Sequence, residues 1–203
     1  MQMRNLIKEK IAANGYAVGA FVASSSATNC EILAMNGYDF VIIDCEHAQT
    51  DSETAVNMFR ACEMYGMAPM VRVYNPYDGP MMSRLLDVGA HGIMVPLVND
   101  APQAKNIVDN TKYAPVGRRG ANGGRGPRWG AYDDYVKVCN DNTLTFVQCE
   151  SIEGVNNIEE IAALPGVDGV FIGTGDLSLE MGIKFKADSS ANHTVDSPEM
   201  VAA

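Results

Sequence analysis

The sequence predicts an α/β protein of the parallel TIM (β/α)8 barrel type, with about six of the eight βα units present in this chain. Short apolar runs alternate with segments of helical period, which is the pattern of parallel βα units. The runs are nearly continuous in apolar content, as expected for strands that are covered on both faces. The predicted strands are residues 17–22, 40–44, 70–73, 92–96, 144–150 and 169–173.

Helices are expected between these strands. Thr50-Asp51-Ser52-Glu53 fits a capping box that begins at Thr50. Further helices are expected at 79–88, ended by a left-handed Gly89, and at 154–164. Their apolar faces are interpreted as core packing. The residues on these faces are Ala55, Met58, Phe59 and Cys62 of the first helix, Met81, Leu85 and Val88 of the second, and Val155, Ile158, Ile161 and Ala162 of the third.

The chain of 203 residues is 47% hydrophobic, which suits one domain with a substantial core. We expect residues 1–203 to form a single incomplete barrel domain. Because six units are two short of a closed barrel, the last two strands are expected to be missing. Ser197-Pro198-Glu199 has the features of a helix start, yet Ala203 follows four residues later.

Composition argues against several classes of partner. A net charge of −10 disfavours nucleic acid and acidic membrane surfaces. No signal peptide and no run of about 20 apolar residues is visible, so a cytoplasmic protein is expected. The cysteines lack CxxC spacing and are expected to be reduced and mostly buried. They are Cys30, Cys45, Cys62, Cys139 and Cys149.

A Gly- and Arg-rich loop interrupts the pattern between Tyr113 and Tyr135. A loop of this length is more often functional than not. Gly123-Gly124-Arg125-Gly126 lacks the Lys-Ser/Thr of a P-loop, so nucleotide binding is not expected there.

Ionisable and amide side chains gather where the predicted strands end. In a parallel barrel these ends converge on the face that carries the active site. The sequence therefore predicts an enzyme site. The residues are Asp44, Glu46 and His47 after the second strand, Arg72 after the third, Gln148 and Glu150 on the fifth, and Asp176 after the sixth.

Glu150 and Asp176 are the predicted metal ligands. Two carboxylates from neighbouring strands repel each other unless a cation lies between them. Oxygen ligands of this kind suit Mg²⁺ or Mn²⁺. The alternative is that Glu150 pairs with Arg72 and Asp176 caps the following helix.

His47 is the predicted general base, with Asp44 holding its ring. The alternative for His47 is a structural histidine, and His91 and His193 are interpreted in that way. Arg72 stays protonated and is suited to stabilise an oxyanion such as an enolate. All lysines fall in helical or loop segments, which disfavours a Schiff-base mechanism.

Taken together, the strand-end motifs resemble the HpcH/HpaI family of class II pyruvate aldolases. The similarity runs from about residue 19 to residue 182. The motifs that carry it are Ile43-Asp44-Cys45-Glu46-His47, Val71-Arg72, Val95-Pro96, Val147-Gln148-Cys149-Glu150 and Gly173-Thr174-Gly175-Asp176-Leu177-Ser178.

The resemblance implies cleavage of 4-hydroxy-2-oxo acids to pyruvate and an aldehyde. The metal would be Mg²⁺ or Mn²⁺, with Co²⁺ or Zn²⁺ as further options, and the full-length form would be a homo-oligomer. Gln148, Thr174 and Gly175 would bind the substrate, and Phe21 would form a pocket wall. One departure is Thr174, where the family has proline in Gly-Pro-x-Asp.

Two other functions remain open from the sequence. A citrate or malyl coenzyme A lyase would use the same enolate chemistry and would need a cationic nucleotide site. The residues available for that site are Arg118, Arg119, Arg125 and Arg128. The second option is an inactive scaffolding subunit, whose open sheet edges would favour association.

Overall fold

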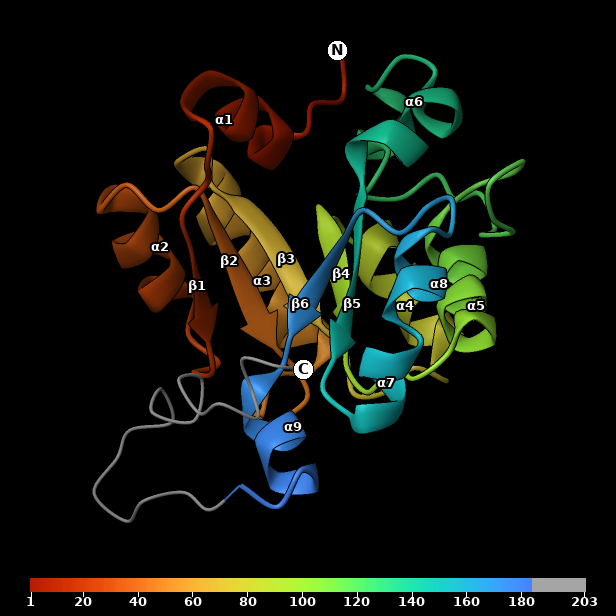
Figure 1. Ribbon diagram of the computed structural model, residues 1–203. Helices are drawn as coiled ribbons and strands as arrows, with labels where there is room; N and C mark the ends of the chain where they lie inside the picture. Colours follow the sequence, from red (N-terminus) through yellow and green to blue (C-terminus); the bar gives the residue numbers. More distant parts are fainter. Residues whose placement is uncertain (184–203) are drawn as a thin grey trace.

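A computed structural model describes residues 1–183 of the chain. Within this range one parallel sheet contains six strands in the order β1-β2-β3-β4-β5-β6 (Figure 1). The strands are β1 (Gly19–Val22), β2 (Phe40–Asp44), β3 (Ala68–Arg72), β4 (Gly92–Val95), β5 (Leu144–Cys149) and β6 (Gly169–Ile172). The predicted barrel-type class with six βα units is therefore confirmed. The predicted helix start at Ser197 and the histidine at 193 lie outside the described residues.

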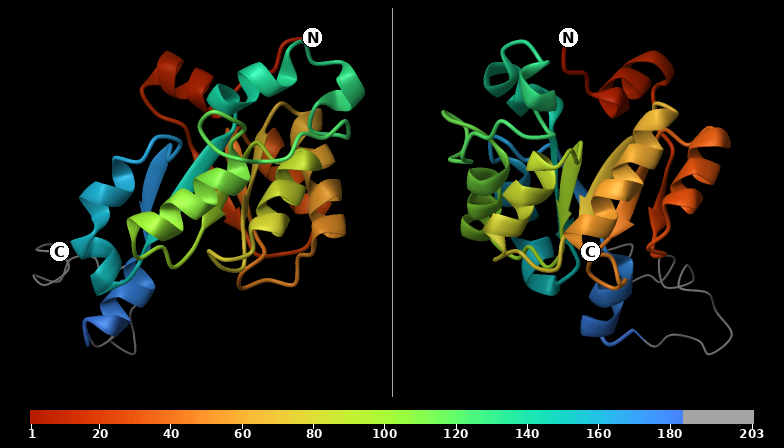
Figure 2. Two further views of the ribbon diagram at one scale, coloured as in Figure 1. Left: turned by 90° about the vertical axis from the view of Figure 1, so that its right-hand side faces the viewer. Right: turned by 180° about the vertical axis from the view of Figure 1, so that it is seen from behind.

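Helices connect all consecutive strands, as a parallel sheet requires. Residues 1–183 contain α1 (Leu6–Asn14), α2 (Ala27–Met35), α3 (Ser52–Met64), α4 (Gly79–Asp87), α5 (Ala101–Thr111), η1 (Arg128–Gly130), α6 (Tyr135–Asn142), α7 (Ile152–Asn156), α8 (Ile158–Ala162) and α9 (Thr174–Glu180). Figure 2 shows α3, α4 and α5 along the outer face of the curved sheet. No helix in this part of the chain has the length and apolar character needed to cross a membrane.

Alternate residues of each strand face the two sides of the sheet. Val41, Ile43 and Val71 belong to the outer core, together with buried residues of α3, α4 and α5. Ile42 and Met70 belong to a second core on the inner face. The inward row therefore contains apolar side chains at mid-strand and polar side chains at the carboxyl end.

The sheet curves so that its two ends approach each other. The rings of Phe21 in β1 and Phe171 in β6 make an edge-to-face contact, with centroids 5.7 Å apart. Glycine supports this curvature on the inner face: a Cβ atom at Gly19 or Gly169 would clash with the ring of a neighbouring phenylalanine. These small residues let the aromatic side chains fill the interior of the partial barrel.

Three details of the predicted helices differ in the structure. Helix α3 is capped by Asp51, whose side chain accepts from the backbone N–H of Thr54, while the Thr50 hydroxyl lies 3.0 Å from that of Ser25. Aspartate is the stronger N-cap residue of the two. The helix predicted at 154–164 is divided at Asn157 into α7 and α8, which leaves Ala162 exposed.

The buried faces of the other helices largely follow the prediction. Ala55, Met58, Phe59 and Cys62 of α3 are all buried. In α4 the buried residues are Gly79, Met82, Leu85 and Leu86, whereas Met81 and the C-cap residue Val88 are only partly buried. Gly89, with φ of +111°, follows the end of α4 as expected. All five cysteines are buried and free, in agreement with the prediction.

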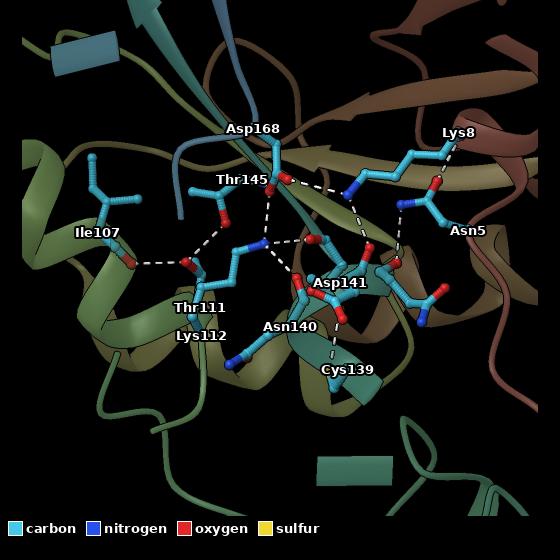
Figure 3. Close-up of polar contacts among 12 residues, drawn as sticks. Asn5, Lys8, Ile107, Thr111, Lys112, Cys139, Asn140, Asp141, Thr145 and Asp168 are labelled. Atoms are coloured by element: carbon cyan, nitrogen blue, oxygen red, sulfur yellow. Dashed lines mark hydrogen bonds and ion pairs between the residues drawn. The ribbon is translucent and has the colours of Figure 1, made fainter. Parts of the chain in front are cut away.

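A buried lysine holds the amino end of the sheet together (Figure 3). The ammonium of Lys112, at the end of α5, donates to the carbonyl oxygens of Asn140 and Thr143 and to the carboxylate of Asp168, the last at 2.7 Å. Asp168 also accepts from the backbone N–H of Thr145. Burial lowers the pKa of Lys112, while the charge of Asp168 opposes that shift. This cluster joins α5, α6 and the starts of β5 and β6.

The Gly- and Arg-rich loop also lies at the amino end of the sheet. Each of its arginines is within 2.8 Å of a carboxylate on α3, α4 or α5, and the pairs are Arg118 with Asp109, Arg119 with Asp87, and both Arg125 and Arg128 with Glu63. Burial would raise the pKa of Glu63, but contacts with His91, Arg125 and Arg128 lower it to about 2. The contacts give this loop a structural role in tying three helices together.

Candidate active site

A pocket of about 330 Å³ lies at the carboxyl end of the sheet. It collects side chains that are far apart in sequence but follow strands β1, β2, β3, β5 and β6. All of the predicted site residues line it except Asp44 and Glu46. The lining residues are Phe21, His47, Arg72, Gln148, Glu150, Phe171, Ile172, Gly173, Thr174, Gly175 and Asp176.

Arg72 is held against one wall of this pocket by Asp44. The two residues are direct neighbours in the register of β2 and β3. Nε and Nη2 of Arg72 donate to the two carboxylate oxygens of Asp44 at 3.0 and 2.8 Å. Burial would raise the pKa of Asp44, but the contacts with Arg72 outweigh burial and lower it. The guanidinium also lies over the ring of Phe21, 5.1 Å from its centroid. Arg72 is therefore a fixed, permanently charged donor.

Within residues 1–183, the side chain of Asp44 does not form the expected hydrogen bond with the His47 ring. The Oδ1 atom of Asp44 instead accepts from the backbone N–H groups of Glu46 and His47, at 3.0 and 3.4 Å. An aspartate at the start of a turn often bonds the backbone in this way. The imidazole Nε2 of His47 lies 3.7 Å from the carboxylate of Glu46. Asp44 therefore orders the His47 backbone, and its side-chain partner is Arg72.

Glu150 is buried with both carboxylate oxygens in hydrogen bonds. Oε1 accepts from the backbone N–H of Leu97 at 2.7 Å, and Oε2 accepts from Nε2 of Gln148. Burial raises the pKa of Glu150, and the charges of Glu46 and Asp176 add to the rise. Arg72 pairs with Asp44 and Glu46 rather than with Glu150. The N-cap residue of α9 is Gly173, and Asp176 lies within the first turn of the helix, so Asp176 is not its N-cap. The alternative roles considered for these two carboxylates are thus not seen in residues 1–183.

The oxygen atoms in this pocket fit a hard divalent cation. Glu150 and Asp176 line one cavity, and their mutual repulsion is the situation that a cation relieves. The Oε1 atom of Gln148 is buried with no hydrogen-bond partner, because the amide nitrogen of that side chain faces Glu150. Residues 1–183 contain no group of three His, Cys, Asp or Glu side chains placed to hold a metal. An ion here would therefore take two carboxylates and complete its shell with neutral oxygens.

Leu97 is a positioning residue that the sequence analysis missed. Its φ of +55° is rare for a branched residue, and this conformation directs its backbone N–H to Glu150. Strained backbone of this kind tends to occur at functional sites. Leu97 directly follows the Val95-Pro96 motif, but a backbone donor leaves no side-chain signal in the sequence.

Gly173 leaves the space in which Glu150 sits. A Cβ atom at this position would clash with the Glu150 carboxylate and crowd the Gln148 amide. We predict that Gly173→Ala displaces Glu150 and weakens Mn²⁺ binding about 10- to 100-fold, the usual range for residues that orient a metal ligand. Calorimetric titration with Mn²⁺ would measure this. Gly123→Ala is the control, because a Cβ there meets nothing within 4 Å. Equal affinities in the two variants would contradict the prediction.

A parallel barrel-type sheet with a guanidinium, an imidazole and two carboxylates in a pocket at its carboxyl end defines the class of a barrel-type enzyme. Residues 17–202 match the family HpcH/HpaI aldolase/citrate lyase. The chain belongs to this family.

Relatives with known names agree with this assignment. The chain is 42% identical to hydroxypyruvate/pyruvate aldolase of Chromohalobacter salexigens over 166 residues. This aligned region covers 81% of this chain and 65% of that protein. It is 36% identical to 2-keto-3-deoxy-L-rhamnonate aldolase of Escherichia coli K12, over 89% of this chain and 68% of that protein. The HpcH/HpaI aldolase from Desulfitobacterium hafniense DCB-2 is similar in structure, with a TM-score of 0.87 and 30% sequence identity. The match covers 98% of this chain and 74% of that chain. The chain thus spans about two thirds of the length of the two named relatives.

Proposed function

We propose that this chain carries the active site of a divalent-metal aldolase that cleaves 4-hydroxy-2-oxo acids to pyruvate and an aldehyde. The observation that carries the proposal is that Arg72, His47 and Gln148 line the same pocket as the carboxylates of Glu150 and Asp176. The two relatives named above are aldolases, which supports the reaction class. Substrates of the 4-hydroxy-2-oxoheptanedioate or 2-dehydro-3-deoxy-aldarate type fit this chemistry.

The cation would be held by Glu150 and Asp176, and the amide of Gln148 would support the substrate in the same pocket. Mg²⁺ or Mn²⁺ suits these ligands best, while Co²⁺ or Zn²⁺ is also compatible with carboxylates. When bound, the ion would supply Lewis-acid polarisation of the substrate's 2-keto group. Backbone N–H groups of Thr174 and Gly175 would hold the substrate carboxylate, and the ring of Phe21 would form the wall of the pocket.

His47 would take the proton from the 4-hydroxyl group of the substrate. As the hydroxyl oxygen becomes the aldehyde carbonyl, the bond between C3 and C4 breaks and its electron pair forms the enolate of pyruvate. Arg72, held in place by Asp44, would donate to the enolate oxygen as charge develops there. Return of this proton to C3 then gives pyruvate and restores the neutral imidazole of His47.

Pyruvate release by the 203-residue chain tests this proposal. Lactate dehydrogenase would detect pyruvate formed from a 4-hydroxy-2-oxo acid, with Mn²⁺ added and after treatment with a chelator. We expect release with Mn²⁺, its loss after chelation and recovery when Mn²⁺ is restored. Glu150→Gln should abolish the response without loss of folding. Release that persists after chelation, or in Glu150→Gln, would refute the metal-dependent mechanism, and a folded, inactive chain would favour the scaffolding alternative.

A lyase for coenzyme A thioesters receives less support. It needs free cationic groups for the nucleotide near the reacting carbon, and the arginines of the Gly- and Arg-rich loop are engaged elsewhere. Arg125 and Arg128 both pair with Glu63 at the end of α3. That pairing lies at the amino end of the sheet, whereas the pocket lies at the carboxyl end. The arrangement therefore favours the pyruvate aldolase.

A further inference from the structure

Glu46 has an unusual environment at the edge of the pocket. Its side chain is only 12% exposed, and its Oε2 atom is buried with no hydrogen-bond partner in the described chain. Burying a carboxylate oxygen in this way is costly unless nearby charge compensates for it. Two groups provide that charge, because Oε2 lies 3.1 Å from Nη1 of Arg72 and 3.7 Å from Nε2 of His47.

The position of Glu46 follows from the way Arg72 is held. Asp44 takes the Nε and Nη2 side of the guanidinium, so that Nη1 is left to face Glu46. Glu150 and Asp176 are the other carboxylates close enough to interact with the charge of Glu46. Within residues 1–183 neither of them forms an ion pair with His47. Glu46 is thus the carboxylate placed between Arg72 and the imidazole.

The position of Glu46 beside Nε2 of the His47 ring affects which ring nitrogen carries the proton. In a neutral imidazole one nitrogen carries the proton and the other accepts one. A carboxylate beside one nitrogen favours the tautomer with the proton on that nitrogen. Because Glu46 lies beside Nε2 of His47, the neighbouring charge favours an Nε2 proton and leaves Nδ1 as the acceptor. At 3.7 Å the two atoms interact through their charges rather than through a hydrogen bond.

We propose that Glu46 is a positioning residue that bridges Arg72 and His47 and makes Nδ1 of His47 the proton-accepting atom. The catalytic consequence rests on the proposed aldolase function, whereas the tautomer does not. Removing the carboxylate should free the ring to sample both tautomers and should slow proton transfer. Binding of the 2-oxo acid should change little, because Glu46 does not line the pocket.

Nitrogen-15 NMR of the histidine-labelled chain, without metal, tests the tautomer directly. The His47→Gln variant identifies the His47 signals among those of the three histidines. We expect the neutral ring of the wild type to carry its proton on Nε2, and Glu46→Ala to show a mixture of tautomers. With Mn²⁺ and substrate, Glu46→Ala should lower kcat about 10- to 100-fold at a nearly constant KM. Glu46→Asp should recover part of the loss, and the exposed Glu159→Gln should match the wild type.

A wild-type ring protonated on Nδ1 would overturn the proposal, as would a Glu46→Ala variant with unchanged tautomer and unchanged kcat. Glu46→Gln has nearly the same shape as the native side chain, so it guards against a misfolded alanine variant. It should also lower kcat, because it lacks the charge that faces Nε2. If the wild type releases no pyruvate, the aldolase function fails, and the NMR result still decides whether Glu46 sets the tautomer.

Discussion

Arg72→Ala should lower kcat/KM for pyruvate release about 1,000-fold, equivalent to about 4 kcal/mol of transition-state stabilisation. The guanidinium is the fixed cation beside the pocket, and Asp44 and the Phe21 ring hold it in place. In the proposed aldolase its hydrogen bonds would strengthen as charge develops on the enolate oxygen, so the loss is expected chiefly in kcat. Steady-state kinetics with lactate dehydrogenase as the coupling enzyme would measure the change.

Arg72→Lys separates charge from geometry. Lysine keeps a positive charge but cannot donate to both oxygens of Asp44 as the planar guanidinium does. We expect it to recover less than about tenfold of the activity lost in Arg72→Ala. The exposed Arg60→Ala is the matched control for removing an arginine outside the pocket. Full activity in Arg72→Lys would show that the fixed orientation of the guanidinium is unimportant. Full activity in Arg72→Ala would show that Arg72 takes no part in the mechanism.

The strands and the residues at their ends were predictable because local sequence encodes both. Apolar runs such as residues 40–44 and 144–149 are buried strands because of their own composition. A polar residue at the end of such a run must lie at the carboxyl edge of a parallel sheet. His47 and Glu150 therefore line one pocket, although their distance from each other cannot be inferred from the sequence.

The partner of each polar side chain was much harder to predict. Asp44 is three residues from His47, and this proximity suggested the pair. Sheet register instead places Asp44 beside Arg72, which is 28 residues away. Register is a property of two strands together, so a single segment does not reveal it. The same limit applies to Leu97, whose contribution is a backbone N–H.

Composition of the Gly- and Arg-rich loop was likewise ambiguous. Four arginines in one loop indicate a cationic surface when their partners are unknown. Arg125 forms an ion pair with Glu63, which is 62 residues earlier in the chain. Only the packing of the helix ends brings such carboxylates to the loop. A cluster of charges in a sequence therefore has two interpretations, an anion site or a set of ion pairs, until the fold is known.

Lys112→Met should be the most destabilising single substitution at the amino end of the sheet, with a loss of about 3–5 kcal/mol in the free energy of unfolding. The native side chain is 2% exposed, and its ammonium donates to two carbonyl oxygens and to Asp168. Methionine has a similar shape but no donor, so it leaves a carboxylate without its buried cation. Urea unfolding followed by circular dichroism would measure the shift in midpoint.

Lys8→Met is the matched control for this prediction. Lys8 contacts the same carboxylate at 3.4 Å but is 47% exposed, and exposed ion pairs contribute only about 0–1 kcal/mol. Adding Asp168→Asn to Lys112→Met should restore part of the loss, because the uncompensated charge is then removed. If Lys112→Met were no less stable than Lys8→Met, the buried ion pair would not be what holds the amino end together. A stable Lys112→Met variant with altered kcat would instead mean that the two ends of the sheet are coupled.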